Sequence, residues 1–323
     1  MPSSPSPFLS SLARRLVALA ALSLATAILL PGRGGAEASP ATIPAGPSRF
    51  EAALPRGQRI AVFAYRAAGH GPDDPIVIVL PGAGRNGDDY RDSWIEAADR
   101  HDLLVLAPTF DEAQFPGPIA YNLAGMIRGT ADATALREVV PTPAEQWLFA
   151  GIEAVFDQAV ARTGSGQSRY DLFGHSAGGQ IVHRMVMFAP EARIRTAIAA
   201  NSGWYTTVSA DIAFPYGLGG WPMPPGQIET AFARRLVILL GARDDASERR
   251  GHLRHTPETD AQGLHRLARG RHFHDVATTE SARRRVPLNW RLEIVPGVGH
   301  DHQAMGIGAA ALLYDGETPT GRN

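Results

Sequence analysis

The feature that most constrains the fold is an alternation of short, wholly apolar segments with longer amphipathic ones. "PIVIVL" and "LVILL" are apolar at every position, which suits strands that are buried on both faces of a parallel sheet. Strands and helices that alternate in this way predict a three-layer α/β domain, with a mostly parallel central sheet and helices on both faces. The expected strands are Arg59–Tyr65, Pro75–Leu80, Leu103–Leu106, Tyr170–Phe173, Thr196–Ala200, Leu236–Leu240 and Arg291–Val295.

The clearest helix signal is the segment "TPAEQWLFAGIEAVFDQAV". Thr142 can cap a helix at this point, Pro143 suits the first helical position, and Glu145 can close a capping box. The sequence therefore predicts a helix that begins directly after Thr142.

The start of the chain has the layout of a secretory signal peptide. Arg14 and Arg15 precede an apolar run over residues 16–30, and the sequence Ala-Glu-Ala ends at Ala38. The run is short for a bilayer-spanning helix of about twenty residues, which favours cleavage after Ala38 over a permanent anchor, the alternative reading. We therefore expect a periplasmic or secreted protein without a stable membrane anchor. The expected divisions are a signal peptide over 1–38, a linker over 39–49 and one folded domain over 50–323.

The charged residues and the missing cysteines exclude several classes of function. The formal net charge is −1, and all 31 basic residues are arginine, which a GC-rich coding bias explains better than a binding role. We therefore expect no nucleic acid partner. Since the chain has no cysteine, disulfides, a cysteine nucleophile and thiolate metal sites are excluded. The sequence does not indicate an oligomeric state.

The segment "YDLFGHSAGGQ" contains the pattern G-x-S-x-G with Ser176 at its centre. The pattern alone is weak evidence, because glycine-rich chains contain it by chance. Here, however, a predicted buried strand precedes it, a helical run follows it, and only a tight turn separates the two. Such a turn holds a serine hydroxyl at the carboxyl edge of the sheet, and Gly174 and Gly178 let the strand and helix backbones approach closely. Ser176 is therefore a candidate nucleophile.

A serine nucleophile needs a histidine base and an acid that orients the base. His300 follows the last expected strand in the glycine-flanked loop "VPGVGHDHQAM". Asp244 and Asp245 follow the strand "LVILL", and only one of these adjacent carboxylates can reach His300. The spacing after Gly241 favours Asp244, with Asp245 as the alternative.

The segment "IVIVLPGAGRNGDDY" supplies a candidate oxyanion loop after an early strand. Gly82 lets the backbone turn in close to the nucleophile. The N–H of Ala83, or alternatively that of Gly84, can then join the N–H of Ala177 in binding a tetrahedral oxyanion.

With these motifs the chain resembles the α/β-hydrolase superfamily, and within it bacterial proteins similar to poly(3-hydroxybutyrate) depolymerases and to feruloyl or acetyl esterases. The resemblance covers about residues 50–314 and is carried by "PGAGRNGDDYRDSW", "LFGHSAGGQIVHRM", "ANSGWYTT" and "VPGVGHD". The order serine, acid, histidine along the chain is that of this fold. One departure is Pro81, where many relatives have a histidine that supports the loop. By position, the resemblance implies Ser176 as nucleophile, His300 as general base, Asp244 as the acid, and Ala83 and Ala177 as oxyanion donors.

Two long connections, residues 108–141 and 203–230, are expected as loop insertions on the carboxyl side of the sheet, where open α/β domains bind their ligands. The second is rich in aromatic residues, which suggests an apolar pocket wall or lid. Packing of this loop onto its own core is the alternative. We expect Trp204, Tyr205 and Tyr121 to contact the substrate.

The histidine pairs in "HFHD" and "GHDHQ" are interpreted as surface histidines, because no thiolates and no second ligand cluster accompany them. No metal and no organic cofactor is expected. The sequence thus predicts an exported serine hydrolase that cleaves small or polymeric carboxylic esters through an acyl-enzyme. A peptidase of the same fold and a non-catalytic exported binding protein are the alternatives. The acyl and alcohol groups cannot be read from the sequence.

Overall fold

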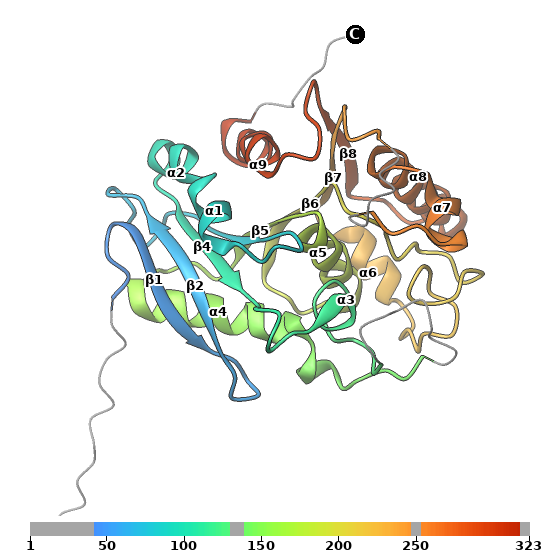
Figure 1. The fold of residues 1–323 in the computed structure, drawn as a ribbon, viewed down its shortest axis with the longest axis horizontal. Helices are drawn as coiled ribbons and strands as arrows, with labels where there is room; N and C mark the ends of the chain where they lie inside the picture. Colours follow the sequence, from blue (N-terminus) through green and yellow to red (C-terminus); the bar gives the residue numbers. More distant parts are fainter. Residues whose placement is uncertain (1–41, 130–138, 247–252, 317–323) are drawn as a thin grey trace, which may run out of the picture. The chain divides into compact units, whose positions relative to one another are not determined.

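The computed structural model describes residues 42–129, 139–246 and 253–316, and within these ranges eight strands form one sheet (Figure 1). The order of the strands is β1-β2-β4-β3-β5-β6-β7-β8. β2 pairs antiparallel with β1 and with β4, and the other neighbours pair in parallel. The strands are β1 (Gly46–Ala53), β2 (Arg59–Arg66), β3 (Ile76–Leu80), β4 (Leu104–Thr109), β5 (Tyr170–His175), β6 (Ile194–Ala200), β7 (Leu236–Gly241) and β8 (Trp290–Val295).

The sheet confirms the three-layer α/β architecture predicted from the apolar segments. Seven strands lie where those segments placed them, with ends that differ by no more than three residues. β1 was not anticipated: it begins at Gly46, inside the segment expected to be a linker, residues 39–49. It is an edge strand with alternating half-buried and exposed residues, and each residue from Gly46 to Ala53 pairs with one of β2. Edge strands tolerate proline and lack a continuous apolar run, so the sequence signal was weak.

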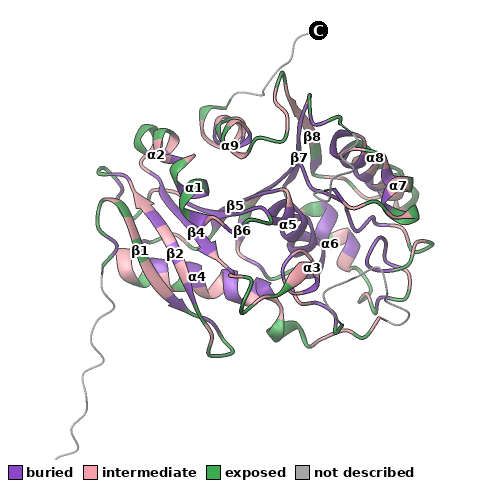
Figure 2. Ribbon diagram, viewed as in Figure 1, coloured by how far each residue is buried: buried purple, intermediate pink, exposed green. Residues whose placement is uncertain are grey.

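Helices cover both faces of the sheet and bury two separate cores. In β3, Ile76, Ile78 and Leu80 face one core, whereas Val77 and Val79 face the other, because successive side chains of a strand point to opposite faces. Helices α4, α5, α6 and α8 contribute to the first core, and α1, α2 and α9 to the second. Figure 2 shows the buried central strands between these helices. The helices are α1 (Gly87–Asp92), α2 (Ile95–His101), α3 (Gly117–Ala120), α4 (Leu148–Thr163), α5 (Ala177–Phe188), α6 (Gln227–Ala233), α7 (Pro257–Gln262), α8 (Arg266–Arg284) and α9 (His302–Ala310).

The start of α4 differs from the sequence prediction. A short 3₁₀ turn (Ala144–Gln146) precedes the helix, which begins at Leu148 after an extended Trp147, and no side chain caps it. The predicted capping box is wrong, because Thr142 has other partners. Its hydroxyl donates to the carbonyl of Gly125 (2.6 Å) and accepts from the indole N–H of Trp147 (3.0 Å).

The predicted signal peptide, residues 1–38, and the cut after Ala38 lie outside the described residues, as does the part of the first loop insertion over residues 130–138. In the described part of the chain, no helix has both the length and the apolar character needed to cross a bilayer.

Candidate active site

Ser176 occupies a strained turn between β5 and α5. Its backbone has φ 57° and ψ −114°, a conformation that is costly for any residue with a side chain. Gly174 and Gly178 permit this turn. A Cβ atom on Gly178 would clash with the carbonyl of Leu80 in β3, and one on Gly174 would clash with the backbone of Gly178. The hydroxyl of Ser176 is thereby held at the carboxyl edge of the sheet.

Ser176, His300 and Asp244 form a continuous series of hydrogen bonds. The Nε2 atom of His300 lies 3.1 Å from the Oγ atom of Ser176, and its Nδ1 atom lies 2.8 Å from Oδ2 of Asp244. Asp244 is buried, whereas the side chain of His300 remains about one-third exposed (31%). The three side chains come from the turns that follow β5, β7 and β8. The structure therefore brings the three predicted residues together at one edge of the sheet.

Asp245 does not join this series. It is exposed, and no hydrogen bond or ion pair of the described residues links it to His300. The carboxylate of Asp244 instead has a second neighbour, because Nη1 of the buried Arg266 lies 3.5 Å from its Oδ1 atom. Arg266 begins α8, and nothing in the sequence singled it out.

Asn201, at the end of β6, fixes the two loops that carry the histidine and the acid. Its side-chain amide donates to the carbonyl of Gly299 (3.0 Å) and accepts from the N–H of Gly241 (2.8 Å). The backbone N–H of Arg243 also donates to the carbonyl of Val298 (2.7 Å). Asn201 was not predicted as a site residue, although it belongs to "ANSGWYTT", one of the segments that carried the family resemblance.

The candidate oxyanion loop lies beside Ser176. The N–H of Arg85 donates to the carbonyl of Gly82 (3.0 Å), which makes a turn with the exposed Ala83 near its tip. A Cβ atom on Gly82 would lie 3.5 Å from Cβ of Ser176. Ala177 is the first residue of α5, so its N–H has no partner within the helix and is available at the helix N-terminus.

Tyr121 was expected to contact the substrate, but in this structure its side chain is closed to solvent and braces the oxyanion loop. It is completely buried, and its hydroxyl donates to the carbonyl of Pro81 (2.7 Å). The guanidinium of Arg85 lies over its ring at 3.9 Å from the centroid and pairs with Glu112 at 2.9 Å. Tyr121 and Arg85 thus support the loop that begins at Pro81, where many relatives have a histidine.

A buried tyrosine and a buried histidine lie beneath the base. The hydroxyl of Tyr90 is 3.0 Å from Nδ1 of His175, whose ring centroid is 4.5 Å from that of His300. Burial, followed by the nearby His300, holds the pKa of His175 well below its usual 6.5. Burial also raises the pKa of Tyr90 to about 12. Both groups are therefore neutral near pH 7, so that neither adds a charge next to His300.

The histidine of "GHDHQ" that follows His300 is not a free surface residue. His302 stacks on the ring of Tyr90 with 4.4 Å between centroids, and it is only partly exposed. Within the described residues, no group of three or more His, Cys, Asp or Glu side chains is placed to hold a metal ion.

Trp204 and Tyr205 are part of the core and do not line an open pocket. Their exposed fractions are 2% and 0%, so neither side chain is open to a substrate in this structure. Both instead pack on the core, which was the alternative to the expected substrate contact. Tyr205 stacks on Phe273 of α8 at 4.5 Å, and its backbone exchanges two hydrogen bonds with the side chain of Gln262.

Arg184 of α5 ties both long connections to the nucleophile helix. It is fully buried and lies over the ring of Trp204 at 4.3 Å from the centroid. Its guanidinium donates to the hydroxyl of Thr206 and to the carbonyl of Asn122, both at 2.9 Å. Burial lowers its pKa to about 9, so the side chain is still protonated near pH 7. Arginine was discounted as a signal because of the coding bias, and this residue was therefore missed.

The chain belongs to the α/β-hydrolase superfamily and is a hydrolase of that fold, as its similarity to two solved structures shows. One is poly(aspartic acid) hydrolase-1 from Sphingomonas sp. KT-1, with 36% identity, a TM-score of 0.78, and coverage of 84% of this chain and 100% of that one. The other is a poly(3-hydroxybutyrate) depolymerase from Bordetella parapertussis, also with 36% identity and a TM-score of 0.78, covering 86% and 93%.

A more distant structure is a siderophore hydrolase from Aspergillus nidulans, at 14% identity and a TM-score of 0.52, which covers 88% of this chain and 100% of that one. At this identity the likeness concerns the fold alone. No family model matches the sequence, and no curated protein matches it.

Proposed function

We propose that the protein is an exported serine hydrolase that cleaves carboxylic esters through a covalent acyl-enzyme. The observation that carries the proposal is the hydrogen-bonded series from Ser176 through His300 to Asp244, at 3.1 and 2.8 Å. A serine hydroxyl is a weak nucleophile unless a base within hydrogen-bond reach accepts its proton and a third group orients that base.

In the proposed mechanism, Oγ of Ser176 attacks the ester carbonyl while Nε2 of His300 accepts the hydroxyl proton. Asp244 holds the Nδ1–H of His300 and stabilises the imidazolium. The N–H groups of Ala83 and Ala177 bind the oxyanion of the tetrahedral intermediate. The intermediate collapses, His300 passes its proton to the departing alcohol, and an acyl-Ser176 ester remains. Water, activated by His300, then releases the acid and regenerates the hydroxyl.

Both 36%-identical relatives are described as acting on polymers, one on poly(3-hydroxybutyrate) and the other on poly(aspartic acid). The first supports a polymeric or oligomeric ester as substrate of this chain. Poly(aspartic acid) is joined by amide bonds, so its hydrolase supports amide hydrolysis as a second candidate function. Its identity and TM-score to this chain equal those of the depolymerase. The same residues serve this reaction if His300 protonates a departing amine.

A fluorophosphonate probe tests the nucleophile. The wild-type protein should be labelled at Ser176, and Ser176→Ala should lose labelling and on the order of 10³-fold or more of its turnover. Ser168→Ala, at an exposed position just before β5, is the matched control and should keep both. If Ser176→Ala retains more than a tenth of wild-type turnover, the assignment is wrong. A non-catalytic binding protein would not be labelled at all.

Comparing the turnover of hydroxybutyrate oligomers with that of poly(aspartate) then separates an ester hydrolase from an amide hydrolase.

Export rests on the predicted signal peptide alone. N-terminal sequencing of protein recovered outside the cytoplasm tests it, and a chain that still begins before Leu16 would refute cleavage after Ala38.

A further inference from the structure

Five arginines line a hollow at the amino edge of the parallel strands. The hollow has a volume of about 620 Å³, and its arginines lie at or just before the first residues of β5, β6 and β7. Because these strands are parallel neighbours, their first residues meet at the edge opposite Ser176. At about 3.3 Å per residue along β5, the two edges are about 20 Å apart. The arginines are Arg169, Arg193, Arg195, Arg234 and Arg235.

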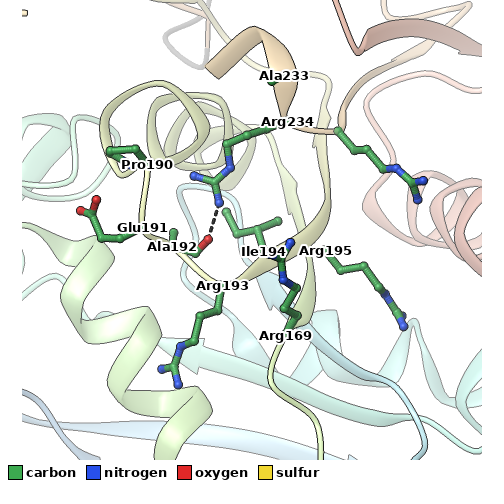
Figure 3. A pocket seen from close by; sticks show the side chains of 10 residues that line it. Arg169, Pro190, Glu191, Ala192, Arg193, Ile194, Arg195, Ala233 and Arg234 are labelled. Atoms are coloured by element: carbon green, nitrogen blue, oxygen red, sulfur yellow. Dashed lines mark hydrogen bonds between the residues drawn. The ribbon is translucent and has the colours of Figure 1, made fainter. Parts of the chain in front are cut away.

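Two of these arginines are paired with carboxylates. Arg193 contacts Glu153 and Asp157, each at 2.6 Å, and Arg195 pairs with Asp171. Figure 3 shows the side chain of Arg193 extending towards α4 and away from Arg234. These ion pairs hold the side chains of Arg193 and Arg195 in place and neutralise the charges of both arginines.

The other three arginines keep their charge in the hollow. Arg234 donates to the main-chain carbonyls of Ala189 and Ala192, which are neutral acceptors that hold the guanidinium in place. Burial lowers the pKa of Arg234, and the nearby charge of Arg169 lowers it as well, whereas Tyr170, Glu153 and Glu191 raise it. Figure 3 shows the side chains of Arg169 and Arg234 directed into the same space. Arg169 and Arg235 are exposed.

Convergence of like charges at a concave surface favours an anionic ligand, and the guanidinium fork matches carboxylate and phosphate oxygens. The carboxylate among the lining residues, Glu191, is exposed and offsets only part of this charge. An anionic membrane is a poorer fit than a hydrophilic ligand. The large exposed apolar side chains of the described residues are Val140, Leu264 and Ile307, none of which lines the hollow.

We propose that this hollow is an accessory binding site for a chain-like polyanion, whose closely spaced carboxylate or phosphate groups are held by Arg169, Arg234 and Arg235. The site holds such a polymer at the edge of the sheet opposite Ser176. It goes beyond the proposed hydrolase function and does not depend on it.

Poly(acrylate) is a suitable probe, because a hydrolase cannot cut its carbon backbone, and its binding by the full chain can be measured by calorimetry at low and at moderate salt. The test variant is Arg169→Gln with Arg235→Gln. The matched control is Arg56→Gln with Arg271→Gln, which removes the same charge from exposed positions elsewhere. Melting temperatures of both pairs establish that each variant is folded.

The test pair should lose at least about tenfold in affinity for poly(acrylate) at low salt, and the control pair should stay within about twofold of wild type. The difference should shrink as salt screens the charges. A polyphosphate of matched charge tells which oxyanion binds more tightly, and dependence of either polymer on Arg169 and Arg235 supports the site. Equal losses in both pairs, no binding at low salt, or binding only to phosphatidylglycerol vesicles would overturn the proposal.

Discussion

Replacing Asp244 with asparagine is the sharpest test of the proposed active site. Asparagine has nearly the same shape as aspartate but has no charge. The carboxylate that it replaces lies 2.8 Å from Nδ1 of His300 and 3.5 Å from Nη1 of Arg266. If the amide turns its NH₂ towards Nδ1, the histidine must carry its proton on Nε2, where it can no longer accept the proton of Ser176.

The expected loss of turnover is on the order of 10⁴-fold, or about 5.5 kcal/mol in the barrier, because both the tautomer and the charge that stabilises the imidazolium are lost. The free energy of unfolding should fall by less than this change in the barrier. The charge beside the buried Arg266 disappears, and a hydrogen bond to a charged group contributes about 1.5–3 kcal/mol. A domain with an unfolding free energy of about 5–15 kcal/mol survives this loss.

The measurement is kcat on a nitrophenyl ester at pH 7.5, together with the free energy of unfolding in urea. Asp245→Asn is the matched control, since Asp245 is exposed beside Asp244, and should change stability by less than about 0.5 kcal/mol. If Asp245→Asn loses more turnover than Asp244→Asn, the acid is the wrong residue of the pair. If neither variant loses more than about tenfold, the hydrogen bond to His300 does not support the base.

Three further predictions follow from buried groups around the site. Tyr121→Phe removes the 2.7 Å hydrogen bond to the oxyanion loop. It should lower kcat by roughly 5- to 30-fold, which is about 1–2 kcal/mol in the barrier, with little change in KM. An unchanged kcat would show that this bond does not position the loop. Trp204→Ala should cost about 3–5 kcal/mol in urea unfolding, because the ring is buried, and should reduce turnover of acetyl and bulky esters equally; a selective loss on bulky esters would restore the pocket role. Burial holds the pKa values of His175 and His183 well below 6.5, so that below pH 6.5 the unfolded chain takes up protons that the folded chain does not. The stability contributed by each is present above pH 6.5 and should be lost as the pH falls below 6.5, by roughly 1 kcal/mol per pH unit at most, and an unfolding free energy that is flat between pH 7.5 and 5.5 would contradict this.

Most of the sheet could be predicted from the sequence because buried parallel strands need apolar residues at every position, and "LVILL" has this pattern at the length of a strand. β1 escaped prediction because it pairs on one side only, and its half-exposed residues carry no such pattern. The start of α4 was misplaced for a different reason. Thr142 has the residue type of a cap, but a tertiary contact with Gly125 takes its hydroxyl, and no local pattern reveals such a contact.

The residues of the candidate active site also fall into those that the sequence predicts and those that it does not. Ser176, Asp244 and His300 each follow a strand that the sequence marks clearly, so their meeting at one edge was predictable from topology. Asn201 and Tyr121 act through hydrogen bonds to main-chain atoms of distant segments, and such bonds depend on geometry that residue types do not encode. The aromatic loop was ambiguous because tryptophan and tyrosine suit both a pocket wall and a core.

The hydrogen bond between His300 and Ser176 joins residues 124 positions apart in the chain, and this separation has a consequence for the order of folding events. His300 follows β8, which lies at the edge of the sheet and pairs with β7. A chain in which β8 has not yet docked can have its helices and its turn at Ser176, yet no base beside the serine. The rate at which a fluorophosphonate labels Ser176 during refolding therefore reports when β8 docks. Far-ultraviolet circular dichroism reports when the helices form.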